Sequence, residues 1–188
     1  MDKIGIDVIH EFVDNSNLIE GYDFPCAMFR DSRHVKNHLS AFNWVVDNYA
    51  IEITPEVIKL IHSILMRNLL AKNHCGHFRK CKVWVGGHLK DSPSLIQEGL
   101  SALCDVIKLG PNKNTNIEDW CMCVHNEFEC IHPFIDGNGR TGRLLLNMLR
   151  LKYGLDIQII YFDNRIDYYN QIKKYEKKRG LVNEKEEI

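Results

Sequence analysis

The chain contains 188 residues, the size of one domain with enough apolar material for its own core. Its 24 lysines and arginines nearly balance 25 aspartates and glutamates, so no overall basic field is available to attract nucleic acid or an acidic membrane. The first residues form no apolar signal segment, and no apolar run approaches the ~20 residues of a membrane span. We therefore expect a cytoplasmic protein without nucleic-acid or membrane partners.

Apolar residues recur at helical spacing along most of the chain, which predicts an all-α bundle. Thr54-Pro55 and Ser92-Pro93 each place a capping side chain before a proline, a common start of a helix, and Asn116 is expected to cap a further helix. The predicted helices lie at Val35–Val46, Thr54–Leu65, Ser92–Gly110, Asn116–Ile131, Arg140–Tyr153 and Asn164–Tyr175. The apolar face of the last helix is expected to contain Ile166, Tyr169, Ile172 and Tyr175. We expect a single domain over residues 1–188, with a frayed tail at 181–188.

Residues 79–88 are the best candidate for a β-hairpin in this helical chain. Here Cys81, Val83 and Val85 alternate with Lys80, Lys82 and Trp84, and Gly86-Gly87 follow as a turn. The sequence therefore predicts one small hairpin.

The seven cysteines form no CxxC pair, and an odd number fits poorly with a closed disulfide framework. Cys75 lies between His74 and His77, but no second pair of ligands follows at zinc-binding spacing. We expect buried thiols and no zinc site.

The run from Ile131 to Arg143, IHPFIDGNGRTGR, carries the chemistry of the chain. Pro133 disfavours helical backbone for the residue before it, so His132 is expected in extended or turn backbone with its imidazole projecting from a loop. With an unperturbed pKa near 6.5, a neutral imidazole can accept a hydroxyl proton at neutral pH. His132 is therefore the candidate base.

The same run has the groups needed to bind a polyphosphate. Gly137 and Gly139 can take positive φ, and successive N–H groups that open a helix make an anion site. Asp136 offers a hard oxygen ligand that suits Mg²⁺ beside substrate phosphates. Arg140 and Arg143 lie three residues apart on the next helix, where their guanidinium groups can hold phosphate oxygens.

The sequence from His132 to Arg143 resembles the Fic family signature, HPF-x-(D/E)-GNGR-x-x-R, and every specified position matches. The resemblance implies a helical bundle with one small β-hairpin. It also implies transfer of AMP from Mg·ATP to a hydroxyl side chain of a target protein. On this basis His132 would deprotonate the target hydroxyl, and Asp136 would hold Mg²⁺.

The resemblance also implies how the phosphates are bound. The amides of Gly137 to Gly139 and the Asn138 side chain would stabilise the charge on the α-phosphate. Arg143 would reach the γ-phosphate, and Arg140 the β-phosphate region.

Two further segments look like family features. Gly76-His77-Phe78-Arg79 is similar to the G-x-(Y/F)-R segment that leads into a flap, here Val83, Trp84 and Val85, which holds the target backbone as an added strand. Tyr168-Tyr169 looks like the tyrosines that flank adenine, and Tyr169 is the better candidate. Relatives often have an asparagine seven residues later, where this chain has Glu176, so nucleotide selectivity stays open.

The segment Ser16-Asn17-Leu18-Ile19-Glu20-Gly21 matches the family's inhibitory pattern, (S/T)-x-x-x-E-(G/N). In a helix Ser16 and Glu20 stand one turn apart on the same face. The implied role is an ion pair between Glu20 and Arg143 that keeps Arg143 from the γ-phosphate. Residues 94–99 match the pattern too, through Ser94 and Glu98.

We favour the first of these two matches because it precedes the helical core and ends in the usual Ile-Glu-Gly. The chain then belongs to the subclass with an N-terminal inhibitory helix. This assigns an inhibitory segment to about residues 10–30 and a Fic core to about residues 35–178.

Three functions remain open on sequence alone. The first is an autoinhibited protein adenylyltransferase, and the second is the same fold transferring UMP or phosphocholine, or removing AMP from modified proteins. The third, a silent regulatory module, is disfavoured by the intact His132, Asp136 and Asn138. Phosphate-transferring relatives replace Gly139 with lysine, which argues against that branch. The sequence names neither the target, which can be the chain itself, nor the oligomeric state.

Overall fold

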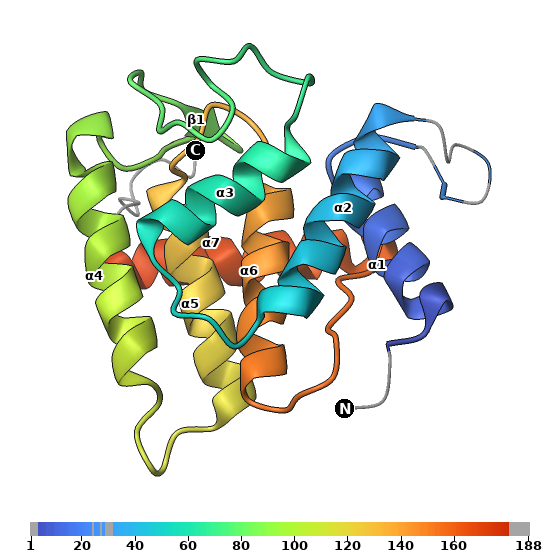
Figure 1. Cartoon of the computed structure of the whole chain (residues 1–188). Coiled ribbons are helices and arrows are strands. Elements are labelled where there is room, and N and C mark those ends of the chain that lie inside the picture. Colours follow the sequence, from blue (N-terminus) through green and yellow to red (C-terminus); the bar gives the residue numbers. More distant parts are fainter. Residues whose placement is uncertain (1–3, 24, 27, 29–31, 181–188) are drawn as a thin grey trace.

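The computed structural model describes residues 4–23, 25, 26, 28 and 32–180 (Figure 1). Within these residues the fold is helical with one antiparallel hairpin, which confirms the predicted fold class. The elements are α1 (Ile6–Ile19), α2 (Arg33–Asn48), α3 (Pro55–Leu65), β1 (Trp84–Val85), β2 (His88–Leu89), η1 (Pro93–Leu95), α4 (Ile96–Leu109), α5 (Ile117–Ile131), α6 (Asn138–Lys152), η2 (Phe162–Asn164) and α7 (Arg165–Arg179). The tail that we expected to fray, residues 181–188, lies outside the described residues.

Two helices begin at the capping residues that the sequence predicted. The Thr54 hydroxyl oxygen accepts a hydrogen bond from the Val57 N–H at 3.3 Å, at the start of α3. The Asn116 side chain accepts one from the Asp119 N–H at 3.0 Å, at the start of α5. These bonds satisfy N–H groups that have no partner inside the helix, so both starts are fixed locally.

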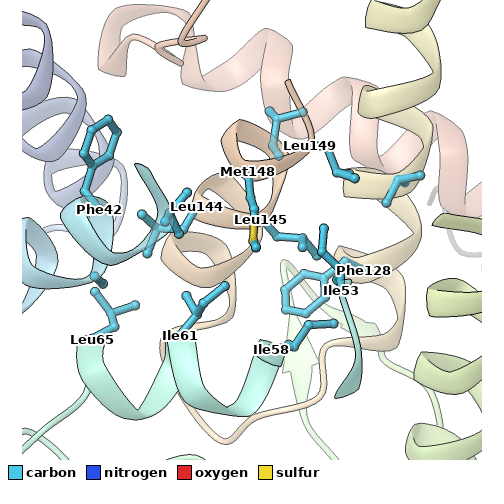
Figure 2. Packing of buried hydrophobic residues seen from close by; sticks show 14 of the residues in the cluster. Phe42, Ile53, Ile58, Ile61, Leu65, Phe128, Leu144, Leu145, Met148 and Leu149 are labelled. Atoms are coloured by element: carbon cyan, nitrogen blue, oxygen red, sulfur yellow. The ribbon is translucent and has the colours of Figure 1, made fainter. Parts of the chain in front are cut away.

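Helix α6 is the centre of the fold and contacts α1, α2, α3 and α5 (Figure 1). All of its residues except Gly139 and Lys152 are buried. Figure 2 shows its apolar side chains against residues of α2, α3 and α5; the labelled side chains are Phe42, Ile53, Ile58, Ile61, Leu65, Phe128, Leu144, Leu145, Met148 and Leu149. The packing fixes the position of the N-terminus of α6, which follows the predicted signature loop.

The apolar face of α7 differs from the one that the sequence predicted. Ile166 is 63% exposed and Tyr169 is 47% exposed, whereas Tyr168, Ile172 and Glu176 are buried. The buried face therefore includes a carboxylate, which forms an ion pair with the buried Lys90. The predicted face was therefore wrong for Ile166 and Tyr169 and correct for Ile172, because a charged residue occupies one of the inward positions and apolar spacing alone does not show it.

The hairpin is shorter than the alternating pattern suggested. Trp84 pairs with Leu89 and Val85 pairs with His88, and residues 79–83 are not in a strand. Trp84, Val85 and Leu89 are exposed. The hairpin thus presents apolar side chains at the surface.

None of the seven cysteines, all of them among the described residues, forms a disulfide. Four of them are buried as expected, but Cys81 and Cys123 are exposed, so the prediction of core thiols was wrong for these two. In the part of the chain that the structure describes, no helix has the length and apolarity needed to cross a membrane.

Candidate active site

His132 is the residue at which α5 ends. Its backbone is left-handed, with φ of 48° and ψ of 61°, and its N–H donates to the Phe128 carbonyl at 2.9 Å. This left-handed conformation is uncommon for a residue with a side chain. It is a turn conformation, one of the two predicted from the sequence, and not the extended one. The helix therefore stops abruptly, and the imidazole projects from the loop with its side chain 16% exposed.

The buried Arg79 holds this turn in place. Its Nε donates to the His132 carbonyl at 2.7 Å, and one terminal nitrogen donates to the carbonyls of Ile131 at 3.2 Å and Asp91 at 2.6 Å. The other terminal nitrogen donates to the Cys81 carbonyl at 2.8 Å. A cation near the last carbonyls of a helix satisfies acceptors that lack a partner and favours the helix dipole. Arg79 thus ties the chain on both sides of the hairpin to the backbone of His132.

His62 of α3 supports the loop that follows His132. Its ring stacks on the buried Phe134 ring, with centroids 3.8 Å apart. The Gly76 N–H donates to Nδ1 at 2.9 Å, so Nε2 carries the proton and donates to the Asp136 carbonyl at 2.9 Å. Burial lowers the pKa of His62 to about 4, which keeps the ring neutral in this bridging role.

The structure corrects the expectation for Asn138. Its side-chain oxygen accepts from the Phe134 N–H at 2.8 Å, and its side-chain nitrogen donates to the Phe134 carbonyl at 2.9 Å. The residue is only 2% exposed. Because both polar groups of the amide close the loop, the side chain is a brace for the loop rather than a group that faces the α-phosphate.

The two glycines of the loop create an open N-terminus for α6. Gly137 has φ of 79°, and a Cβ there would lie 2.7 Å from the Met66 sulfur. A Cβ on Gly139 would overlap the Glu20 carboxylate, which lies directly against this residue. The absence of a side chain at position 139 therefore lets a carboxylate reach the end of the helix where N–H groups attract anions.

Arg143 is buried beneath the C-terminal end of α1, where the sequence predicted an inhibitory segment. Its Nε donates to the Ser16 hydroxyl at 2.8 Å, and one terminal nitrogen donates to the Ser16 carbonyl at 2.9 Å. The same nitrogen forms an ion pair with Glu20 at 2.8 Å. Burial, the largest single effect, disfavours the charged guanidinium, but Glu20, Tyr168 and Glu129 together outweigh it and raise the pKa of Arg143.

The second match to the inhibitory pattern is elsewhere. Ser94 and Glu98 are both exposed, in η1 and α4, and the Ser94 hydroxyl lies 3.0 Å from that of Ser92. Two segments that match the pattern equally well in sequence therefore have different surroundings in the structure.

Arg140 does not share the surroundings of Arg143, although the sequence placed both on one face. Its side chain is fully buried, with the guanidinium carbon 4.8 Å from the centre of the Tyr22 ring. One terminal nitrogen lies 3.4 Å from His34 and the other 3.9 Å from Asp136. Two side chains three residues apart on a helix differ in direction by about 60°. This difference is enough for Arg143 to reach the cavity while Arg140 packs against Tyr22.

A cavity of about 420 Å³ lies between the signature loop, the hairpin, α1 and α7. Residues from all four regions line it, among them Glu20, His132, Gly139, Arg143, Tyr169 and Glu176. Of the flap residues, Val85 lines it. The lining does not include Ser16, Val83, Trp84, Asp136, Gly137, Asn138 or Arg140, the other residues that the sequence singled out.

Tyr168 and Tyr169 of α7 both line the cavity, but they differ in exposure and in hydrogen-bond partner. Tyr169 is half-exposed, lines the cavity and donates its hydroxyl to the Ile19 carbonyl at 3.1 Å. Tyr168 is buried, and its hydroxyl lies 2.9 Å from Nε2 of His125. Tyr169 therefore offers a ring to the cavity while connecting α7 to the C-terminal end of α1.

The electrostatics of the cavity differ from those assumed on sequence. Burial, assisted by the charges of Lys90 and Arg79, lowers the pKa of His132 to about 3. Burial also raises the pKa of the Glu129 carboxyl to about 7. The imidazole is thus neutral at physiological pH, and a carboxyl group that titrates near neutrality lies one helical turn before it.

Sequence reasoning missed the roles of Glu129, Lys90 and Glu176. Lys90 and Glu176 form an ion pair whose side chains are 4% and 5% exposed, and both line the cavity. The spacing of Glu129 and His132 at the end of a helix was a signal that could have been used. No local pattern connects Lys90 with Glu176, because the two are 86 residues apart.

Asp136 fits the role of a magnesium ligand that shares its ion with a substrate. Its side chain is 46% exposed, and one carboxylate oxygen accepts from the Gly137 N–H at 2.6 Å, beside the N-terminus of α6. Among the described residues, no group of three or more His, Cys, Asp or Glu side chains is arranged to hold a metal. One exposed carboxylate suffices for Mg²⁺ only where phosphate oxygens and water complete the shell.

Residues 52–149, about half of the chain, match the profile of the Fic/DOC family. A protein adenylyltransferase Fic from Nematostella vectensis is 26% identical over 178 residues, which cover 85% of this chain and 42% of that protein. A protein of the same name from Drosophila willistoni is 35% identical over 98 residues, or 52% of this chain and 20% of the relative. The chain thus spans less than half of these relatives.

Solved structures share the fold. A Fic domain containing signaling protein from Bacteroides thetaiotaomicron superimposes with a TM-score of 0.80 at 22% identity, over 93% of this chain and 74% of the other. Residues 134–508 of Fic-1 from C. elegans give a TM-score of 0.77 at 21% identity, over 92% of this chain and 56% of the other.

Proposed function

Since this chain belongs to the Fic/DOC family, we propose that it is an autoinhibited protein adenylyltransferase that transfers AMP from Mg·ATP to a hydroxyl side chain of a target protein. The observation that carries the proposal is that His132, the N-terminus of α6 at Gly139, and Arg143 all border one cavity. A base, an anion site and a phosphate-binding guanidinium are the groups that nucleotidyl transfer requires.

In the proposed reaction His132 is the general base. Its Nε2 takes the proton of the target hydroxyl while the hydroxyl oxygen attacks the α-phosphorus of ATP. The bond from that phosphorus to the bridging oxygen breaks, and pyrophosphate leaves with the electron pair. The amides at the start of α6 face the phosphate whose charge must be stabilised, and Asp136 is the residue that would hold Mg²⁺, which neutralises phosphate charge when bound with ATP.

The phosphate roles of two residues change with the geometry. Arg143 remains the candidate for the γ-phosphate because it lines the cavity. Arg140 and Asn138 act indirectly, by packing beneath Tyr22 and by closing the loop on Phe134. The main-chain amides therefore carry more of the anion binding than the sequence suggested.

Glu20 is the proposed inhibitor. Its carboxylate pairs with Arg143 and lies against Gly139, so one side chain occupies both the cation and the helix end that a triphosphate would need. Ser16 adds two hydrogen bonds to the same guanidinium and keeps it turned toward α1. ATP in productive alignment has to displace these contacts.

The flap and Tyr169 are the proposed contacts for target and nucleotide. Trp84 and Val85 are exposed on a two-stranded hairpin whose edge can accept a further strand. Tyr169 offers a ring to the base. In this proposal the ion pair of Lys90 and Glu176 helps to set nucleobase selectivity. UTP and CDP-choline are therefore tested beside ATP.

The test is transfer of label by the Glu20→Gly variant in a cell lysate, with ATP labelled at the α- or the γ-phosphate. The proposal expects α-label on the variant itself or on a lysate protein, no γ-label, and an adenylyl mass on the modified hydroxyl residue. Transfer of γ-label, or of uridylyl or phosphocholine groups in place of AMP, would contradict the proposed donor. Loss of AMP from a modified protein without any transfer would reverse the direction of the reaction.

A further inference from the structure

Two buried polar groups near the end of α5 face each other without hydrogen bonds. Nδ1 of His132 lies 3.8 Å from Oε2 of Glu129, three residues earlier. Within the described residues, neither that Nδ1 nor the other carboxyl oxygen of Glu129 has a hydrogen-bond partner. Buried polar atoms of this kind carry a free-energy cost, so their retention beside a reacting group calls for a function.

The neighbouring helix leaves room for this carboxyl group. A Cβ on Gly142 of α6 would overlap Oε1 of Glu129, and it would lie 3.0 Å from the ring of Phe128. Any larger residue at position 142 would push the carboxyl group aside. The space for Glu129 therefore depends on a glycine inside the signature helix.

The reaction sets a problem that Glu129 can solve. To take a proton at Nε2, the neutral imidazole must carry its hydrogen on Nδ1, and that hydrogen needs an acceptor. Buried among the charges of Lys90 and Arg79, His132 alone accepts a proton poorly, since its pKa falls to about 3. The Glu129 main-chain carbonyl faces the ring and opposes this fall.

We propose that Glu129 is a positioning residue for the reaction proposed above: its carboxylate accepts the Nδ1–H of His132, fixes the reactive tautomer and stabilises the imidazolium that forms when Nε2 takes the hydroxyl proton. This inference rests on the proposed function. The proton on Nδ1 stays between the two residues throughout, and no other bond changes there. Catalytic triads use the same arrangement, in which a third group orients the base.

The present distance of 3.8 Å is longer than a hydrogen bond. Catalytic hydrogen bonds are often long in proteins without substrate and tighten in the substrate complex. The charges that face Glu129 are Arg143 from α6, Lys90 from the hairpin side, Glu20 from α1 and Glu176 from α7. Burial, Glu20 and Glu176 disfavour the carboxylate form, whereas Arg143 and Lys90 favour it; the net effect is a raised pKa of about 7, at which the carboxylate form of Glu129 is present near neutral pH.

The kinetic test compares Glu129→Gln with Glu127→Gln, both in the full chain carrying Glu20→Gly. Glu127 lies on the same helix, outside the cavity lining, and contacts Tyr175 and Arg179. We expect Glu129→Gln to lower kcat for AMP transfer at least about tenfold with little change in KM for ATP, since the loss falls on the transition state. Glu127→Gln should keep the parent kcat. An unchanged kcat in Glu129→Gln, or a loss confined to KM, would overturn the proposal and leave the main-chain carbonyl as a sufficient acceptor.

A second measurement needs neither transfer nor a folded variant. The ¹⁵N chemical shifts of the His132 ring in the unsubstituted protein report which nitrogen carries the proton at neutral pH. We expect the Nδ1–H form, and the Nε2–H form would overturn the proposal. If the Nδ1–H form is found and no variant transfers AMP, the proposed function fails while the assignment of the proton to Nδ1 of His132 stands. If AMP transfer is normal but the tautomer is Nε2–H, the proposed function stands and the positioning of His132 by Glu129 fails.

Discussion

Removing the carboxylate of Glu20 should activate the protein. The substitution Glu20→Gly deletes one charge-assisted hydrogen bond of 2.8 Å to Arg143 and vacates the space against Gly139. A hydrogen bond to a charged group is worth about 1.5 to 3 kcal/mol. Because Glu20 is 28% exposed and Ser16 keeps its bonds to Arg143, the lower end of that range applies. About 1.4 kcal/mol corresponds to a tenfold gain in productive ATP binding.

The assay is the initial rate of α-label transfer over a range of ATP concentrations, with apparent ATP affinity measured by calorimetry. Glu98→Gly is the matched control because Glu98 belongs to the other copy of the inhibitory pattern and is exposed on α4. A glycine inside that helix costs roughly 1 kcal/mol of stability, so the control should lose yield without gaining activity. Adding Arg143→Ala to Glu20→Gly should return activity toward the starting level, because both act on one phosphate contact. Activation by Glu98→Gly, with none by Glu20→Gly, would refute the reasoning.

Three further outcomes follow from the site. Asp136→Ala should abolish the Mg²⁺ dependence of ATP binding in calorimetric titrations, and an unchanged dependence would move the metal elsewhere. Arg79→Met leaves buried carbonyls unpaired and should lower the free energy of unfolding by about 3 kcal/mol, or Tm by roughly 6 to 12 °C in a thermal melt; a shift under about 2 °C would show that the hydrogen bonds of Arg79 are dispensable. Burial lowers the pKa values of His62 and His125 to about 4, so the unfolded chain binds more protons below pH 6.5. Urea denaturation should therefore show stability falling from pH 6.5 toward pH 4, by up to about 1.4 kcal/mol per pH unit for each histidine, and a stability that rises instead would contradict these shifts. The raised pKa of Glu129 has the opposite effect on stability, because its contribution to the free energy of unfolding is lost as pH rises through about 7.

Local chemistry made the framework of this protein predictable from sequence. Thr54 and Asn116 cap the helices that they were expected to start, because a capping side chain bonds only to backbone a few residues away. The glycine turn before α6 follows the same rule, since Gly137 has the positive φ that its lack of a Cβ permits. The ion pair between Glu20 and Arg143 was reached through the family resemblance, not through spacing.

The directions of individual side chains were not predictable, because they depend on partners far along the chain. Arg140 turns toward Tyr22, and Asn138 folds back on Phe134, although both looked like phosphate ligands. The buried face of α7 was predicted correctly only at Ile172, because Glu176 points inward to Lys90, a partner far along the chain. The low pKa of His132 likewise arises from burial and from cations of the hairpin region, which no motif encodes.

The most direct test of the central claim is the intact mass of the protein, or of its lysate target, after incubation with Mg²⁺ and ATP. Four forms are compared: the unsubstituted chain, Glu20→Gly, His132→Ala and the double variant. We predict an added adenylyl mass for Glu20→Gly alone, with a loss of about 10² to 10⁴-fold in rate for the double variant. The double variant should still bind ATP, because Arg143 and the N-terminus of α6 are unchanged. Equal adenylylation by Glu20→Gly and by the double variant would contradict the assignment of His132 as the base.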